Sequence, residues 1–227
     1  MEIIESLEQV RERKASPEWV RVAGMSKRYG SLDALAGVEF SIRRPEILGL
    51  IGPNGAGKTT LFECMAGVLP PTAGVVFVDS QPISLTNRSR TLFYLPDAIA
   101  PWPSQTVRWA LDFTMGFFGG RSDLLSDVIE GLSLTPQPVL LADEPFEGLD
   151  LRQSREVANI LRAHALSGRT LFLSIHQIAD AARICDRFIL LSGGRVCGEG
   201  TLEELSSLAR SRGAPASTLE EVFLALT

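Results

Sequence analysis

The sequence predicts an α/β fold with a mostly parallel sheet, on three observations. With 227 residues, 45% of them hydrophobic, the chain can bury a full core as one domain. Strand-like and helix-like segments alternate through its second half, which is typical of a parallel sheet with helices on both faces. A glycine-rich stretch, residues 52–60, lies between a predicted strand and a predicted helix.

Residues 1–16 differ in composition and hydrophobic pattern from the rest of the chain. Glutamates and basic residues accompany Ile3, Ile4, Leu7 and Val10 at helical spacing, so we expect a short amphipathic N-terminal extension. This segment lacks the apolar core of a signal peptide, and no run in the chain approaches the roughly 18 apolar residues of a membrane-spanning helix. We therefore expect membrane association only through a partner.

Residues 17–227 are predicted to form one domain that begins with an antiparallel β subdomain. Between residues 19 and 83, the predicted strands cover residues 19–29, 37–44, 46–52 and 73–83. A segment rich in aromatic residues and proline follows at 98–120, and its second half has helical character up to Gly119-Gly120. We assign a shortened helical subdomain to about 98–137.

Regular alternation begins at residue 138. The predicted elements are, in order, a strand at 138–145, a helix at 151–168, a strand at 170–176, a helix at 178–185 and a strand at 186–191. On the longer helix, Val157, Ile160, Leu161 and Ala165 are expected to share the buried face. The carboxyl ends of parallel strands meet at one edge of a sheet, so we expect ligands to bind there.

Charge and cysteine content exclude some classes of function. The net charge is −5 and the basic residues are scattered, so we expect no nucleic-acid partner. Cys64, Cys185 and Cys197 have neither metal-ligand spacing nor an even count. We interpret them as reduced thiols of a cytoplasmic protein.

The glycine-rich stretch carries the first functional signal. Residues 52–60 read GPNGAGKTT, which fits G-x-x-x-x-G-K-[ST]. Glycines allow successive backbone amides and the N-terminus of the next helix to face phosphates, while Lys58 reaches the terminal phosphates and the Thr59 hydroxyl ligates Mg²⁺. The predicted nucleotide-binding residues are Asn54, Gly55, Ala56, Gly57, Lys58, Thr59 and Thr60.

A second signal is the run VLLADEP, in which an apolar strand ends in two acids. We expect the strand to deliver Asp143 to the Mg²⁺ ion and Glu144 to a water that attacks the γ-phosphate. A strand that simply ends in two solvated acids is the alternative. The phosphate-binding loop earlier in the same chain favours the catalytic interpretation.

Together these motifs resemble the ATP-binding subunit of ABC transporters. GPNGAGKTT, LLADEPFEGLD and the histidine that ends LFLSIH carry the resemblance, which covers residues from about 19 to the end. It implies an ABC-type P-loop NTPase fold with ATP and Mg²⁺ as cofactors. It also implies that Tyr29 stacks on adenine, Glu144 is the catalytic carboxylate, His176 senses the γ-phosphate and Asp150 lies in a loop that meets a second subunit.

For two of these residues, Tyr29 and His176, a non-functional interpretation stays open. Tyr29 could be an exposed turn tyrosine, and a histidine at the end of a strand is usually a satisfied surface residue. His176 lies one predicted strand beyond Glu144, which places both at the edge of the sheet where ligands bind. For His176 we therefore favour the functional interpretation.

The resemblance also implies a physiological role. The C-terminal TLEEVFLALT resembles the ending of ATPases that drive bacterial exporters of drugs, antibiotics, lipids and polysaccharides. It implies ATP hydrolysis that energises export through a separate membrane permease, by a homodimer at the cytoplasmic face of the inner or plasma membrane. A soluble ABC protein of DNA repair or translation is disfavoured by the single ATPase unit and the acidic charge.

The sequence departs from the family at two places. Asp97 follows YLP where the family has a glutamine, and we assign it to the metal as a substitute. The LSGGQ signature is also missing before the LLADEP strand: the resemblance implies a further roughly 25 to 30 residues near Thr135-Pro136, with a helix whose N-terminal amides meet the γ-phosphate of the opposite subunit. Either the printed sequence omits a segment, or the protein lacks its signature helix and is an ATP-binding, hydrolysis-deficient interaction or regulatory module.

The stretch LSGGR at residues 191–195 spells most of that signature in another place. A working signature must begin a helix, and the following RVCGEGT is poor helix sequence. After RFILL, glycines at 193 and 194 are typical of a hairpin turn. We predict a β-turn far from the nucleotide.

Overall fold

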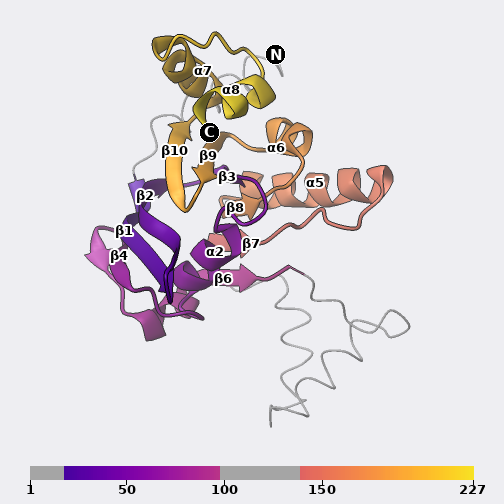
Figure 1. Cartoon of the computed structure of the whole chain (residues 1–227). Helices are drawn as coiled ribbons and strands as arrows, with labels where there is room; N and C mark the ends of the chain where they lie inside the picture. The colour runs from indigo at the N-terminus through magenta and orange to yellow at the C-terminus, as the bar shows by residue number, and fades with distance from the viewer. Residues whose placement is uncertain (1–17, 98–138) are drawn as a thin grey trace, which may run out of the picture. The chain divides into compact units, whose positions relative to one another are not determined.

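The structure is a computed structural model that describes residues 18–97 and 139–227 (Figure 1). The predictions for residues 1–16, for the helical segment within 98–120 and for the helical subdomain at 98–137 lie outside these residues. The described part consists of two β-sheets and the helices that cover them. None of the helices within these two ranges has the length and apolar character needed to cross a bilayer.

The first sheet is antiparallel and comes from the N-terminal part of the chain, as the sequence predicts. Its strands are, in spatial order, β2 (Leu32–Arg43), β1 (Glu18–Tyr29), β4 (Ala73–Val78) and β5 (Gln81–Pro82). Buried Val38, Phe40 and Ile42 alternate with more exposed residues along β2, which is the period-two pattern of a half-buried strand. β2 begins at Leu32, five residues earlier than predicted.

The second sheet is mostly parallel and contains the strand that leads into the glycine-rich loop at residues 52–57. Its strands are, in spatial order, β10 (Arg195–Gly200), β9 (Arg187–Ser192), β3 (Ile47–Ile51), β8 (Thr170–Ser174), β7 (Val139–Ala142) and β6 (Leu92–Leu95). All neighbours are parallel except β10, which pairs antiparallel with β9. Because β3 lies between β8 and β9, the loop after β3 is flanked by the segments that follow those two strands.

Both faces of the parallel sheet are covered. Leu48 and Leu50 of β3 belong to a hydrophobic cluster with the antiparallel sheet and α2 (Lys58–Ala66), while Ile47 and Ile51 belong to a second cluster. The helices that contribute to this second cluster are α5 (Leu151–Leu166), α6 (Ile178–Ile184), α7 (Leu202–Ser211) and α8 (Leu219–Leu226). The helices therefore separate to the two faces, as the strand and helix alternation predicts (Figure 1).

Two local predictions need correction. On α5, Leu161 and Ala165 are buried as expected, but Ile160 is 57% exposed. The buried positions of this helix follow three- and four-residue steps through Leu161, and a residue directly beside it in sequence is rotated away from that stripe. Helix α7 was not predicted, although Thr201 and Glu204 form a capping box at its start, with reciprocal hydrogen bonds of 2.7 and 3.2 Å.

A buried cluster of charges connects the two sheets. The guanidinium of Arg187, at the start of β9, donates to both carboxylate oxygens of Glu46 at 3.1 Å and to Glu199 of β10 at 2.6 Å. The backbone amide of Ser41 on β2 also donates to Glu199, at 3.3 Å. Burial raises the pKa of Glu46, and the charge of Arg187 opposes that shift. The cluster therefore depends on each charge having its partner.

Candidate nucleotide-binding site

The loop at residues 52–57 joins β3 to α2 and leaves the first turn of that helix open for an anion. Gly57 is the N-cap of α2, with φ 102°, and no side chain caps the helix there. A Cβ on Gly57 would lie 2.5 Å from the carbonyl oxygen of Ala34, so the close approach of β2 requires glycine at this position. Unpaired amides at a helix N-terminus, together with the helix dipole, favour the binding of phosphate.

Lys58 is held at the mouth of this loop. Its side chain is only 6% exposed, and Nζ donates to the carbonyl oxygen of Gly52 at 3.0 Å. The same Nζ lies 3.5 Å from Oε1 of Glu144. The ammonium is thus fixed between the loop and the second acid of the LADEP run, where a phosphate group would be neutralised by it.

Asp143 and Glu144 follow β7 at the carboxyl edge of the parallel sheet. Asp143 is 3% exposed, and its Oδ1 accepts a hydrogen bond from the hydroxyl of Ser174 at the end of β8. Glu144 has φ 46°, a left-handed conformation that costs a non-glycine residue about 1–3 kcal/mol. Its amide donates to the same Ser174 hydroxyl at 2.9 Å, which helps to hold that conformation.

The residues around Asp143 fit a magnesium ion. Oδ2 of Asp143 is buried and has no hydrogen-bond partner among the described residues, so one carboxylate oxygen is available to a cation. Thr59 lies in the first turn of α2 and lines the same cavity as Lys58 and Glu144. Within the described ranges, no group of three or more His, Cys, Asp or Glu side chains gathers as a metal cage. One carboxylate oxygen and one threonine hydroxyl suit Mg²⁺, which usually takes one or two protein oxygens together with substrate phosphates and water.

Tyr94 on β6 belongs to the same buried polar group. Its hydroxyl is buried and has no hydrogen-bond partner among the described residues. Burial and then the neighbouring charge of Asp143 raise the pKa of Tyr94, so its hydroxyl keeps its proton. Tyr94 therefore has a neutral hydroxyl near the charge of Asp143, and it was not identified from the sequence.

A cavity of about 490 Å³ brings together all the predicted nucleotide-binding residues except Ala56, which is buried. It is lined by Tyr29, Leu32, Asp33, Ala34, Asn54, Gly55, Gly57, Lys58, Thr59, Thr60, Glu144, Gly193 and Gly194. Its volume lies in the range of small-molecule sites, about 300–1,000 Å³. Tyr29 ends β1 and is 47% exposed, with the ammonium of Lys27 5.1 Å from its ring centroid. The antiparallel sheet therefore contributes the ring of Tyr29 to the same cavity that the glycine-rich loop lines.

The prediction for LSGGR was correct about the turn and wrong about its place. Gly193 and Gly194 connect the antiparallel strands β9 and β10, with φ values of 53° and 71°. The turn is close to the loop predicted to bind nucleotide, because the Gly194 amide donates to the Ala56 carbonyl at 3.1 Å. The reason is topological: β9 is the parallel neighbour of β3, so both strands end at the same edge.

Gly194→Ala tests this contact. A Cβ would lie 2.6 Å from the carbonyl oxygen of Ala34, and the positive φ adds strain of about 1–3 kcal/mol. We expect the turn to shift from Ala56 and the affinity for ATP to fall at least about fivefold, measured by calorimetric titration. Gly168→Ala is the matched control, because Gly168 has φ 91° and no atom within 4 Å of the added Cβ. Equal ATP affinity in both variants would contradict the structural role of the turn.

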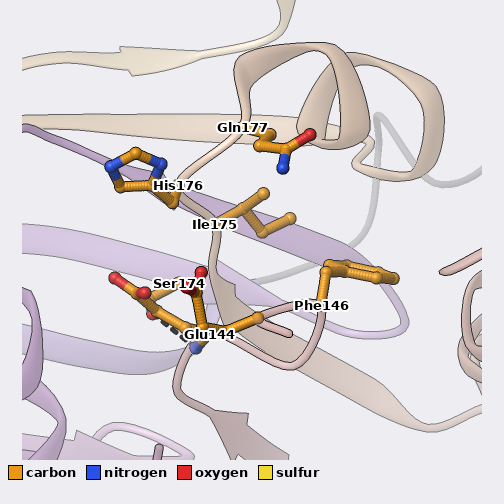
Figure 2. A pocket seen from close by; sticks show the side chains of 7 residues that line it. Glu144, Phe146, Ser174, Ile175, His176 and Gln177 are labelled. Carbon is orange, nitrogen blue, oxygen red and sulfur yellow. Dashed lines mark hydrogen bonds between the residues drawn. The ribbon is translucent and has the colours of Figure 1, made fainter. Parts of the chain in front are cut away.

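A second, smaller cavity places His176 next to Glu144. It has a volume of about 10 Å³ and is lined by Glu144, Phe146, Glu147, Ser174, Ile175, His176 and Gln177. Figure 2 shows the His176 ring and the Glu144 side chain extending to the same side of this cavity. The volume is close to the minimum for one water molecule, about 10–15 Å³. The expected pairing of these two residues at the edge of the sheet is therefore reproduced.

Asp97 and Asp150 line neither of these two cavities. Asp97 is exposed, just after β6. Asp150 is the N-cap of α5: its Oδ1 accepts from the amides of Arg152 and Gln153, both at 2.8 Å. The Asp150 amide in turn donates to Oε1 of Gln153 at 3.0 Å. This Asp-x-x-Gln capping box was visible in the sequence and was not identified there.

Ser174 was not identified from the sequence, although it forms hydrogen bonds with both Asp143 and Glu144. A signal for it exists: side chains two apart on a strand share a face, and Ser174 precedes His176 by two positions. Neither the sequence pattern nor the resemblance gave it a role.

Several known ATP-binding proteins are similar to this chain in sequence. A family model described as ABC transporter matches residues 35–130. The Nod factor export ATP-binding protein I of Ralstonia nicotianae is 30% identical over 216 positions, covering 81% of this chain and 67% of that protein. The SkfA peptide export ATP-binding protein SkfE of Bacillus subtilis is 28% identical, covering 78% of this chain and 87% of that protein. The chain spans 40% of the length of the Escherichia coli ABC transporter ATP-binding protein YbhF, to which it is 28% identical.

The alignments contain positions that have no counterpart in this chain. The match to YbhF runs over 234 positions but includes 89% of the 227 residues, about 202, so about 32 positions are unmatched. The match to the Nod factor export protein runs over 216 positions and includes 81%, about 184 residues, so again about 32 are unmatched.

Solved structures show the same fold. The ATP-binding subunit of an ABC transporter superposes with a TM-score of 0.70 at 24% identity, covering 92% of this chain and 99% of that one. An ATP-binding cassette in a dimeric post-hydrolysis state, bound to ADP and phosphate, superposes with a TM-score of 0.65 at 21% identity, covering 80% and 98%. The predicted fold class, an ABC-type P-loop NTPase, is confirmed. The chain belongs to the ATP-binding proteins of the ABC transporter family.

Proposed function

We propose that the chain is the ATP-binding and ATP-hydrolysing subunit of an ABC exporter and energises a separate membrane permease. The observation that carries the proposal is the single cavity in which Tyr29, the loop at 54–60 and Glu144 meet. The Tyr29 ring could contact the base of a nucleoside triphosphate while the glycine-rich loop contacts its phosphates. The names of the two export proteins among its relatives support export as the direction of transport.

Each predicted residue has a task in this proposal. The amides of the first turn of α2 and the Lys58 ammonium bind the phosphates, and the Tyr29 ring stacks on adenine. Thr59 and Asp143 would hold Mg²⁺, which neutralises charge on the phosphate oxygens when bound. Asp97 is proposed to act on the metal from the end of β6, in place of the usual glutamine.

Glu144 is proposed as the general base. Its carboxylate accepts a proton from the water whose oxygen attacks the γ-phosphorus, and the bond from that phosphorus to the β-γ bridging oxygen breaks, which gives ADP and inorganic phosphate. His176, across the small cavity, is proposed to contact the γ-phosphate oxygens. The small cavity that both residues line has a volume close to that of one water molecule.

The partners follow from the same proposal. Two copies would pair head to tail in the ATP-bound state, with the loop at Asp150 at their interface, and a permease would link the pair to the cytoplasmic face of the membrane. The net charge of −5 disfavours nucleic acid as a partner. The transported substrate is not part of the proposal.

A second function is favoured by one observation. Each of the two alignments has about 32 positions without a counterpart in this chain. This number is similar to the length of the segment that the sequence analysis finds missing. A chain without the signature helix would bind ATP through the cavity described above but would not complete the site of a second subunit. It would then be an ATP-binding interaction or regulatory module with little hydrolysis.

Phosphate release at saturating ATP, measured over a range of protein concentrations, separates the two functions. For a hydrolysing homodimer we expect the rate per chain to rise with concentration and then level off, because two chains form each site. A rate per chain that is independent of concentration would contradict the homodimer. ATP binding with no phosphate release at any concentration would favour the regulatory module.

A further inference from the structure

The hydroxyl of Ser174 bridges the two acids of the LADEP run. Ser174 is fully buried at the carboxyl end of β8. Its Oγ donates to Oδ1 of Asp143 and accepts from the amide of Glu144 at 2.9 Å, and Figure 2 shows it beneath His176 and beside Glu144. One hydroxyl therefore uses its donor and an acceptor position on adjacent residues with different chemical tasks.

The first contact determines how the Asp143 carboxylate faces. Because Ser174 bonds Oδ1, the carboxylate cannot rotate freely, and Oδ2 is the oxygen left without a partner among the described residues. Groups that hydrogen-bond to a metal-binding carboxylate orient it and influence its affinity for the ion. Ser174 is in that position with respect to the predicted Mg²⁺ ligand.

The second contact holds the backbone from which Glu144 extends. At φ 46°, Glu144 is in a conformation that L residues adopt only when their surroundings impose it. The bond from its amide to Ser174 is one such constraint, and the side chain then reaches Lys58. Loss of the hydroxyl would free both the orientation of Asp143 and the backbone of Glu144.

We propose that Ser174 is a positioning residue that aligns Asp143 for Mg²⁺ and Glu144 for proton transfer, and so couples metal binding to hydrolysis. This rests on the proposed function. A hydroxyl with a purely structural role would affect stability alone. Here both partners belong to the acid pair, so the proposal predicts an effect on Mg²⁺ dependence that a structural role would not produce.

The test compares the full-length chain with Ser174→Ala, Ser174→Thr and Ser206→Ala. Ser206 is a buried serine of α7, outside the site, and controls for the loss of a buried hydroxyl. ATP affinity is measured by calorimetry with Mg²⁺ and with EDTA, and the ratio of the two dissociation constants reports the metal. Steady-state phosphate release gives kcat and KM.

For Ser174→Ala we expect the Mg²⁺ enhancement of ATP affinity to fall roughly 10-fold or more, as for other residues that orient metal ligands. Affinity in EDTA should stay within about twofold, and kcat should fall more than KM rises, because ground-state contacts to the phosphates are retained. Ser174→Thr keeps the hydroxyl and should restore most of the enhancement. Ser206→Ala should leave the ratio unchanged.

An unchanged Mg²⁺ ratio in Ser174→Ala, or a Ser174→Thr variant as defective as Ser174→Ala, would overturn the proposal. The binding ratio also separates this inference from the proposed function. If the wild-type chain binds ATP with Mg²⁺ enhancement but releases no phosphate, hydrolysis is ruled out while the ratio still decides the role of Ser174. If Mg²⁺ does not enhance ATP binding in the wild-type chain, the role of Ser174 toward the metal is refuted.

Discussion

Replacement of Glu144 by glutamine should lower kcat for ATP hydrolysis about 10²- to 10⁴-fold, the usual contribution of a general base. Glutamine keeps the shape of the side chain but cannot accept a proton from water. The variant keeps Lys58 and the loop at residues 52–57, so its ATP affinity should change far less than its kcat. Phosphate release and calorimetric titration with ATP measure the two effects separately.

Glu156→Gln is the matched control for that experiment. Glu156 is an exposed residue of α5 that pairs with Arg152 at 3.2 Å, outside the two cavities. We expect its hydrolysis rate to equal that of the wild-type chain. If Glu144→Gln also hydrolysed ATP at the wild-type rate, Glu144 would not be the base.

Replacement of Arg187 by methionine should cost about 3–5 kcal/mol of the free energy of unfolding, as expected when one partner of a buried ion pair is removed. The guanidinium is 6% exposed and bonds to Glu46, which is 3% exposed, and to Glu199. Methionine fills part of the volume but leaves the Glu46 carboxylate buried without its counter-charge. Urea unfolding, followed by circular dichroism, measures the loss.

Two further variants show whether the charge causes the loss. The double variant Arg187→Met with Glu46→Gln removes the stranded charge and should recover part of the stability. Arg152→Met breaks the solvent-exposed pair with Glu156 and should leave the unfolding midpoint nearly unchanged. If Arg187→Met and Arg152→Met had the same midpoint, the buried cluster would not contribute as described.

Local sequence pattern was sufficient for the core of the site. In the motif at residues 52–60, position 57 must be glycine because a Cβ there would clash with β2, and Lys58 follows it. The geometry of the loop can therefore be predicted from the motif alone. Asp143 and Glu144 follow an apolar strand, and parallel strands end at one edge. These requirements are local, and they can therefore be deduced from the sequence.

Long-range contacts account for what the sequence did not disclose. The Gly194 turn contacts Ala56, 138 positions earlier, because β9 happens to be the neighbour of β3 in the sheet. Ser174 reaches Asp143 from another strand, and no motif marks it. Ile160 is apolar yet exposed, because position around the helix and not residue type decides which face is buried. Strand order and side-chain contact are tertiary information.

The central claim is that the loop at residues 52–60 binds the phosphates of ATP through Lys58 and the first turn of α2. Calorimetric titration of ATP into the wild-type chain and into Lys58→Ala tests it most directly. A charge-assisted hydrogen bond contributes about 1.5–3 kcal/mol, which corresponds to a roughly 10- to 150-fold larger dissociation constant in the variant. That loss is the predicted result, and equal affinity of the two chains for ATP would contradict the account.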